Sequence, residues 1–247
     1  MSILEYQDLS LNYDVQPILQ DINLKIEKGN ITVIVGQSGS GKSTLLKATL
    51  GLLLSNAKIV KGHILFEDTL LKDENLDQLR GTKIGMIFQN PLTFFDDFKT
   101  IAYHFYETLH YHFHLDKKQA RNKAKTLLNQ VLLDESILEK YPFELSGGMA
   151  QRVMIALTLA LQPDLILADE PTSSLDVVSQ KQLLDLLLDL KKQTTIVLVT
   201  HNIQVAKYLA DQIVVIKDGR IIEQGKASQI LTSPTHPYTK SLIMKGS

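Results

Sequence analysis

Residues 36–44 read Gly36-Gln37-Ser38-Gly39-Ser40-Gly41-Lys42-Ser43-Thr44, and this stretch is the most specific local signal in the sequence. It fits the pattern G-x-x-x-x-G-K-[ST] and lies between an apolar, strand-like run at residues 31–35 and a helix-like pattern at residues 42–53. In such a loop the glycines let backbone N–H groups turn around a β-phosphate, Lys42 adds a positive charge, and Ser43 offers a hydroxyl to Mg²⁺. The stretch predicts a phosphate-binding loop in which every residue from 36 to 44 is a candidate nucleotide contact.

Two acids follow a second apolar run, Leu165-Ile166-Leu167-Ala168-Asp169-Glu170. A magnesium–nucleotide site needs a carboxylate at the end of a neighbouring strand, and Asp169 is predicted to face the metal. Glu170 would then lie near the γ-phosphate, where it can orient or deprotonate the attacking water. The loop and the two acids together indicate hydrolysis of a nucleoside triphosphate.

The surrounding pattern predicts an α/β fold. Residues 3–11 and 22–26 alternate apolar and polar, which is typical of an antiparallel β region, and residues 99–161 have an almost entirely helical pattern. Further apolar runs at residues 165–168, 196–199 and 213–216 are separated by helical stretches, as in a mostly parallel, covered sheet. We therefore expect a single domain over residues 1–247, with a nucleotide-binding core at about 1–90 and 162–230, a helical subdomain at 91–161 and a C-terminal tail at 231–247.

Composition excludes several classes of protein. The 247 residues contain 26 Lys and Arg against 27 Asp and Glu, so the chain has no overall basic field for non-specific binding of nucleic acid. The absence of cysteine excludes disulfides and thiolate metal sites. The N-terminus lacks the pattern of a signal peptide, and the apolar stretch at residues 153–161 is too short to span a bilayer. Neither export nor a membrane crossing is predicted.

A further motif, Leu145-Ser146-Gly147-Gly148-Met149-Ala150-Gln151-Arg152, resembles the signature motif of the ATP-binding cassette (ABC) ATPases. Ser146 and the amides of Gly147 and Gly148 at a helix start form an anion site, but the motif supplies no lysine or metal ligand. In the family this element covers the γ-phosphate of ATP held by the other subunit. The resemblance therefore implies an ABC-type P-loop ATPase core, with ATP and Mg²⁺ as cofactors and two ATP molecules held in a head-to-tail dimer.

Other positions match the family's remaining motifs in the same order along the chain. Gln89 resembles the glutamine that senses Mg²⁺ and links the site to the helical insertion, and His201 resembles the histidine that contacts the γ-phosphate. Asp176 closes the stretch Ser173-Ser174-Leu175-Asp176, which resembles the loop that crosses the dimer interface, with Ser174 where alanine is more usual. Tyr13 lies where the family places an aromatic ring on adenine, although Tyr6 occupies the same strand region.

The number of nucleotide-binding motifs in the chain indicates the class of ABC protein. A single phosphate loop and a single signature, without long coiled coils or membrane helices, favour a separate transporter ATPase subunit over an ABC ATPase that acts on nucleic acid or the ribosome. The implied partners are ABC permease subunits, a second ATPase subunit that is the same or a paralogous chain, and, indirectly, an extracytoplasmic solute-binding protein. We expect no nucleic acid partner and a peripheral location on the cytoplasmic face of the cell membrane.

The C-terminal stretch at residues 233–242 resembles the tail of ATPases that serve peptide, opine and nickel importers. Residues 147–156 and 175–178 look most similar to the nickel-importer ATPase, which favours nickel or a metallophore over oligopeptides as the transported substrate. Residues 93–98 depart from the family pattern, and the three rings of Phe94, Phe95 and Phe98 are interpreted either as buried packing or as an exposed docking patch for the permease.

A histidine-rich segment at residues 104–114 raises the question of a metal site. His110 and His114 are spaced four residues apart, as metal ligands on a helix can be. No carboxylate or cysteine completes a coordination set there, so the pattern favours an amphipathic helix surface.

Overall fold

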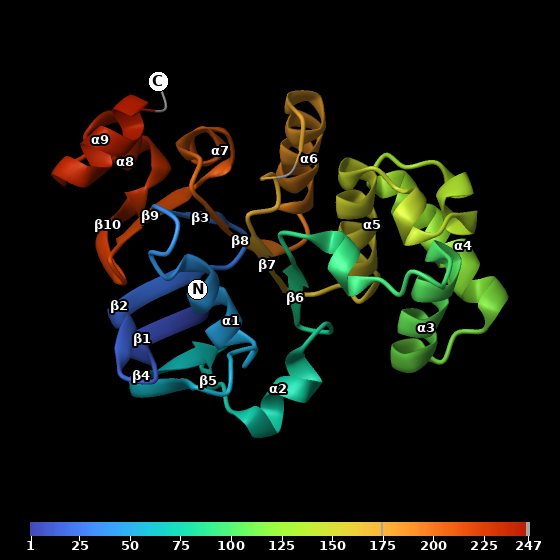
Figure 1. The fold of residues 1–247 in the computed structure, drawn as a ribbon, viewed down its shortest axis with the longest axis horizontal. Helices are drawn as coiled ribbons and strands as arrows, with labels where there is room; N and C mark the ends of the chain where they lie inside the picture. Colours follow the sequence, from blue (N-terminus) through green and yellow to red (C-terminus); the bar gives the residue numbers. More distant parts are fainter. Residues whose placement is uncertain (174, 246–247) are drawn as a thin grey trace.

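The computed structural model describes residues 1–173 and 175–245, and Figure 1 shows their arrangement. The N-terminal part forms a four-stranded antiparallel sheet in the order β2-β1-β4-β5, as the alternating pattern predicted. Its strands are β1 (Ser2–Tyr13), β2 (Gln16–Glu27), β4 (Ala57–Phe66) and β5 (Thr69–Leu70). Sequence patterns had indicated only the first two of these strands.

The second sheet has six strands in the order β10-β9-β3-β8-β7-β6. The strands from β9 to β6 pair in parallel, and β10 pairs antiparallel with β9. The apolar runs predicted to be strands are β3, β7, β8 and β9, so the mostly parallel α/β fold is confirmed. The strands are β3 (Ile31–Val35), β6 (Ile84–Ile87), β7 (Leu165–Asp169), β8 (Thr195–Thr200), β9 (Gln212–Lys217) and β10 (Arg220–Lys226).

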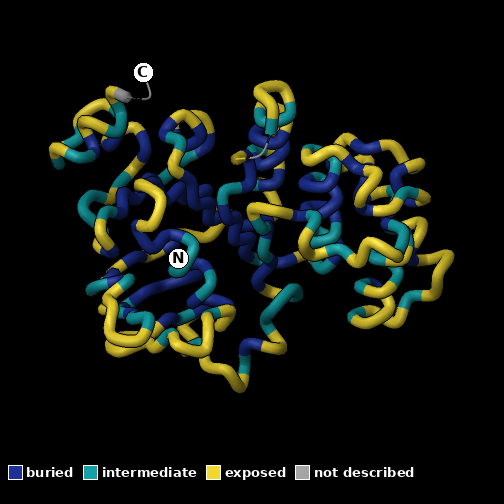
Figure 2. Tube along the Cα trace, viewed as in Figure 1, coloured by how far each residue is buried: buried dark blue, intermediate teal, exposed yellow. Residues whose placement is uncertain are grey.

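The centre of the six-stranded sheet is covered on both faces. Ile31, Val33 and Val35 of β3 pack into one apolar core with the helices, whereas Ile34 packs into a second core against the four-stranded sheet. Every residue of β3, β7 and β8 is buried, and Figure 2 shows these strands as continuous dark blue segments. Burial on both faces explains why these strands are runs of apolar residues without alternation.

Helix α1 (Lys42–Thr49) starts directly after the phosphate loop and packs between the two sheets. The predicted helix over residues 42–53 was wrong in its last turn. Gly51 adopts a left-handed conformation with φ +63°, and the N–H groups of Gly51 and Leu52 donate to the carbonyls of Ala48 and Lys47. This pattern of hydrogen bonds ends a helix.

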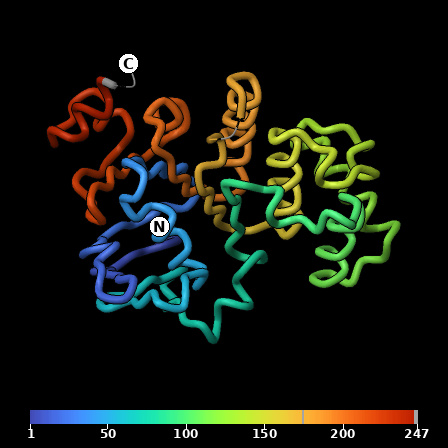
Figure 3. The backbone as a smooth tube through the Cα atoms, in the orientation of Figure 1, coloured from blue at the N-terminus to red at the C-terminus, as the bar shows by residue number. Residues whose placement is uncertain are grey.

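The segment predicted to be helical lies beyond β6 at one end of the molecule, and Figure 3 shows the chain leaving β6, passing through it and returning to β7. It contains α3 (Ile101–Phe113), α4 (Lys117–Gln130) and α5 (Gly147–Ala160), together with 3₁₀ turns at Pro91–Phe94, Glu135–Glu139 and Pro142–Glu144. The remaining helices are α2 (Asp73–Leu79), α6 (Val177–Leu190), α7 (Ile203–Leu209), α8 (Ala227–Thr232) and α9 (Pro237–Lys245). Among the residues that the structure describes, no helix is long and apolar enough to cross a membrane.

Candidate nucleotide-binding site

The loop at residues 36–41 joins β3 to α1 and wraps around the side chain of Lys42. The ammonium group of Lys42 donates to the carbonyl oxygens of Gly36 and Gln37, both at 2.9 Å. Lys42 is only 5% exposed, and burial lowers its pKa against the opposing effect of the carboxylates of Glu170 and Asp169. A cation with few solvent contacts and two nearby carboxylates is therefore held at the base of the loop.

Two glycines of the loop cannot carry a side chain without rearrangement. A Cβ at Gly36 would lie 2.2 Å from the carbonyl oxygen of Ile216 in β9. Gly41 has φ +95°, and a Cβ there would lie 2.7 Å from Leu19. Helix α1 also has no side-chain cap at Gly41, so its first N–H groups are available to an anion. The local backbone thus fits a bound phosphate group.

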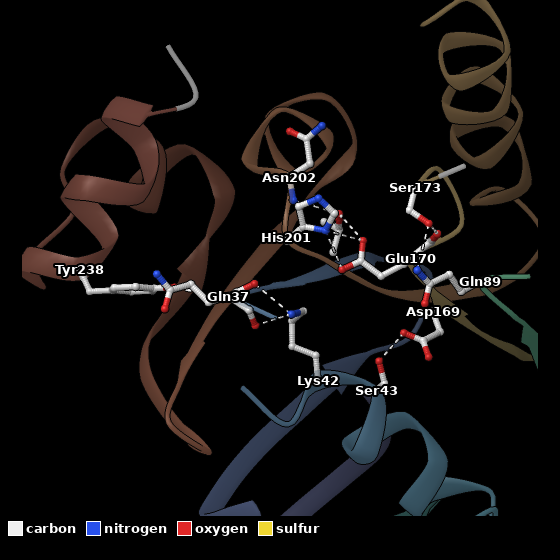
Figure 4. Close-up of polar contacts among 12 residues, drawn as sticks. Gln37, Lys42, Ser43, Gln89, Asp169, Glu170, Ser173, His201, Asn202 and Tyr238 are labelled. Carbon is white, nitrogen blue, oxygen red and sulfur yellow. Dashed lines mark hydrogen bonds and ion pairs between the residues drawn. The ribbon is translucent and has the colours of Figure 1, made fainter. Parts of the chain in front are cut away.

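Ser43 and Asp169 meet across the end of β7. The Ser43 hydroxyl donates to Oδ1 of Asp169 at 2.7 Å, as Figure 4 shows. Asp169 is 6% exposed, and burial raises its pKa although the hydrogen bond from Ser43 opposes the shift. A carboxylate and a hydroxyl supply the oxygen ligands that Mg²⁺ prefers. The pair therefore fits the predicted metal site.

Glu170 is fixed by the strand next to it. The left-handed conformation of Glu170, with φ +46°, turns its side chain away from the direction of Asp169, and its N–H donates to the carbonyl of Val199 in β8. Nδ1 of His201 lies 3.0 and 3.1 Å from the two carboxylate oxygens of Glu170, and the Thr200 hydroxyl donates to one of them at 3.2 Å. The His201 side chain is 62% exposed, so it stands at the mouth of the site.

Gln89 follows β6 and reaches the same site from the side of the helical segment. Its amide nitrogen donates to the Ser173 hydroxyl at 3.3 Å, and that hydroxyl donates to the carbonyl oxygen of Glu170 at 3.0 Å. A chain of hydrogen bonds therefore connects the start of the helical segment with the predicted catalytic acid (Figure 4).

One cavity of about 910 Å³ collects most of the predicted residues. Tyr13 and Gln89 line it together with Glu170, His201 and the phosphate loop, while Ser40 and Asp169 are buried beside it. Sequence reasoning missed four lining residues, namely Ile18, Asn202, Ile203 and Leu242. Only Leu242 had a sequence signal, because it lies in the tail motif.

The signature residues lie outside this cavity. Ser146 caps α5 by accepting a hydrogen bond from the N–H of Met149 at 3.3 Å, and Gly147 and Gly148 form the first turn of the helix. Ser146 and Gly147 are exposed, and α5 is separated from α1 by β6 and β7 in Figure 1. Within one chain the structure therefore does not bring the signature to the phosphate loop.

Asp176 has a local structural contact that the sequence did not reveal. Its carboxylate caps α6 by accepting from the N–H groups of Val178 and Ser179 at 3.0 Å and from the Ser179 hydroxyl at 2.6 Å. Hydrogen bonds from Ser179 lower the pKa of Asp176. Asp176 does not line the cavity, and the neighbouring Ser174 lies outside the described residues.

Comparison with known proteins decides the family, since residues 19–173 match the family described as ABC transporter. The chain belongs to the ABC transporter family. It is 38% identical over 253 residues to the oligopeptide transport ATP-binding protein OppD of Lactococcus lactis subsp. cremoris (strain SK11), covering 98% of this chain and 75% of that protein. It is also 35% identical over 252 residues to the metal-staphylopine import system ATP-binding protein CntD of Staphylococcus aureus (strain NCTC 8325 / PS 47), covering 98% and 93% of the two chains.

Solved ABC structures have the same fold. The cbiO1 protein of Clostridium perfringens, part of the ABC transporter complex cbiONQ, matches with TM-score 0.81 and 30% identity over 94% of this chain and 91% of its own. The ATP-binding cassette MJ0796, in a dimeric post-hydrolysis state bound to ADP and phosphate, matches with TM-score 0.80 and 31% identity over 91% and 98% of the two chains. The predicted ABC-type ATPase fold and ATP as the nucleotide are confirmed.

Proposed function

We propose that this chain is the ATP-hydrolysing subunit of an ABC importer and that it acts as a dimer around ATP. One observation carries the proposal. The phosphate loop, Glu170 and His201 share one cavity, while Ser146 of the signature caps α5 outside that cavity. A site with a charged half and a separate backbone half is complete only when a second cassette supplies its signature.

The residues of the cavity have different roles in ATP hydrolysis. Lys42 leaves the carbonyls of Gly36 and Gln37 and neutralises phosphate charge, and the free N–H groups of α1 bind the same anion. Glu170, held by Thr200 and His201, accepts a proton from the water that attacks the γ-phosphate. Nδ1 of His201 holds the Glu170 carboxylate, and the exposed ring lines the cavity, where it can contact the γ-phosphate.

Ser43, Asp169 and Gln89 would hold Mg²⁺. The metal ion, when bound, neutralises charge on the β- and γ-phosphate oxygens. Asp169 keeps the Ser43 hydroxyl oriented before the nucleotide arrives. Tyr13 at the end of β1 lines the outer part of the cavity and offers its ring to adenine.

A second cavity, of about 450 Å³, supports coupling to a permease. Its lining includes Leu52 after α1, Met86 of β6, Phe94 of the 3₁₀ turn, Phe95 directly after that turn, and Met154 of α5. Phe94 stacks on Phe88 with 3.8 Å between ring centroids, and Phe95 packs on the core beside His104. This groove is the proposed site for a cytoplasmic helix of the permease.

The two interpretations of the phenylalanines apply to different rings. Phe98 is 92% exposed and is proposed as a further permease contact beside the groove, whereas Phe95 lines the groove and is partly buried against the core. We expect Phe98→Ala to keep the ATPase activity and the melting temperature and to weaken co-purification with the membrane subunits expressed with it. Tyr111→Ala, at an exposed ring of α3, is the matched control. Equal co-purification of both variants would exclude Phe98 from the interface.

The transported substrate is proposed from the relatives. They serve oligopeptide transport in one case and metal-staphylopine import in the other, and the nickel-type sequence features favour a metal or metallophore. Radioactive uptake in cells that carry Lys42→Ala in this chain tests the choice directly. Loss of nickel uptake with oligopeptide uptake retained supports the metal substrate, and the opposite result supports peptides.

Hydrolysis is tested by separating ATP binding from turnover. We expect Lys42→Ala to lose ATP affinity and hydrolysis together, because the cation contacts ground-state phosphate. Glu170→Gln should retain ATP binding and lose turnover by about 10²- to 10⁴-fold, the usual contribution of a general base. Calorimetry measures binding and phosphate release measures turnover. Wild-type turnover in Glu170→Gln would contradict the assignment of the base.

A further inference from the structure

The C-terminal segment at residues 233–245 forms part of the wall of the nucleotide cavity. Leu242 of α9 lines the cavity, although it lies far along the sequence from the phosphate loop. The backbone N–H of Gln37, inside the loop, donates to the hydroxyl of Tyr238 at 3.1 Å. A tail that touches both the cavity and the loop is placed to influence the nucleotide.

The tail is anchored on the hairpin of β9 and β10. The Glu223 carboxylate of β10 accepts from the N–H and the hydroxyl of Thr235, at 2.7 and 2.9 Å, and from the N–H of His236 at 3.1 Å. Burial acts to raise the pKa of Glu223, but hydrogen bonds, those from Thr235 and His236 among them, lower it to about 2. Lys217 of β9 stands over the Tyr238 ring at 5.3 Å. The ring is therefore held by contacts that do not involve the loop.

Gln37 is held from two sides. Its carbonyl oxygen accepts from Lys42 at 2.9 Å and its N–H donates to Tyr238, and Figure 4 places Gln37 between these two residues. The Lys42 contact must break when the ammonium group turns toward phosphate. The Tyr238 contact lies on the side away from Lys42, so it can remain when the nucleotide is bound.

We propose that Tyr238 is a positioning residue for nucleotide binding, which holds the phosphate loop through the N–H of Gln37 while Glu223 anchors the tail. This inference rests on the proposed function, because it requires ATP in the cavity. Since linkage is reciprocal, a tail that favours ATP binding is itself held more firmly when ATP is bound.

The test compares ATP affinity in variants that remove single contacts. Tyr238→Phe keeps the ring over Lys217 and removes only the hydroxyl, so we expect the Kd for ATP to rise about threefold to tenfold, the usual range for one hydrogen bond, with kcat at saturating ATP and the melting temperature unchanged. Tyr111→Phe removes an exposed hydroxyl on α3 and serves as the control, with wild-type Kd expected. Glu223→Ala, outside the cavity, should raise the Kd at least as much, and adding Tyr238→Phe to it should cause no further loss.

The outcomes separate this inference from the proposed function. Failure of the wild-type chain to bind ATP would refute the proposed function itself. A wild-type Kd in Tyr238→Phe would overturn the role of Tyr238, and additive effects of the two substitutions would overturn the anchoring role of Glu223. Should Glu223→Ala fail to fold, hydrogen exchange at the Gln37 amide decides: faster exchange in Tyr238→Phe supports the contact, and unchanged exchange contradicts it.

Discussion

Two helices of this molecule begin at sequences that resemble anion sites, but their N-termini differ. Helix α1 follows Gly41 and has no side-chain cap, and Lys42 is buried at its start. Helix α5 follows Ser146, whose hydroxyl accepts from the N–H of Met149, and its first residues are exposed or half-exposed. One N-terminus opens into a cavity with charged side chains, and the other presents backbone groups and one hydroxyl to the surface.

This difference is what the proposed function predicts for a site shared between two chains. At α1, Lys42 can compensate phosphate charge, and Ser43 and Asp169 at the end of β7 would hold Mg²⁺. At α5 the Ser146 hydroxyl keeps its proton to donate, but the charged side chains of the site are on the other side of β6 and β7. Under the proposed function, the first N-terminus binds the nucleotide and the second completes the site of another cassette.

The largest expected effect is the recovery of ATP hydrolysis when two inactive variants are mixed. Lys42→Ala and Ser146→Arg should each reduce hydrolysis by at least about 100-fold, because each destroys a different half of the site. In a statistical mixture of dimers, one site in each mixed dimer has two intact halves, so we expect about a quarter of wild-type activity to return. Phosphate release measures the recovery.

The matched control is a mixture of Lys42→Ala with Glu170→Gln, which change the same half-site. No activity should return in that mixture. Recovery in both mixtures, or in neither, would contradict a site shared between two copies.

Adding a methyl group at each N-terminus tests the difference in backbone strain. Gly41→Ala would place a Cβ at φ +95° and 2.7 Å from Leu19, so we expect a loss of about 1–3 kcal/mol in the free energy of unfolding. Gly148→Ala places its Cβ at 3.2 Å from the Ser179 hydroxyl without a positive φ, and its effect should stay within about 0.5 kcal/mol. Urea unfolding measures the free energy of unfolding of both variants. Equal losses in the two variants would contradict a difference in backbone strain between the two N-termini.

Removal of the N-cap of α5 should change the free energy of unfolding by a smaller amount. Ser146→Ala removes the acceptor for the Met149 N–H, and we expect the free energy of unfolding to fall by about 1 kcal/mol, the usual value for a lost N-cap. Ser146→Asp keeps an acceptor and should retain wild-type stability. Thermal unfolding of both variants checks the result. A loss as large in Ser146→Asp would show that the hydroxyl has another structural role.

Acid should release the tail from the loop before α1, because Glu223 anchors the tail. The pKa of Glu223 is lowered from 4.5 to about 2, so its contribution to tail docking is complete above about pH 4.5 and is lost as the pH falls toward 2. The NMR signal of the Gln37 amide should shift over this range, because Tyr238 leaves it. The Gly148 amide on α5 is the internal control. Parallel shifts of both amides would indicate general unfolding instead.

The chemistry of the loop and the fold class could be predicted from the sequence alone. The pattern at residues 36–44 is local, because the spaced glycines and the helix start create the anion site within a few residues. The apolar runs of β3, β7 and β8 were also readable, because burial on both faces leaves no polar positions. Strand β4 of the four-stranded sheet was not predicted, because most of its residues are exposed and lack an apolar pattern.

Which distant residues meet could not be predicted from the sequence. The sequence pattern placed Glu170 and His201 after two different strands. The parallel pairing of β7 with β8 brings Nδ1 of His201 to 3.0 Å from a carboxylate oxygen of Glu170. The tail motif resembled a family without revealing its position, and the structure places Tyr238 against Gln37 and Thr235 against Glu223 of β10. Such contacts join residues that are far apart in the chain, so no local pattern encodes them. Their geometry is set by strand order and by the packing of α9 against the completed sheet.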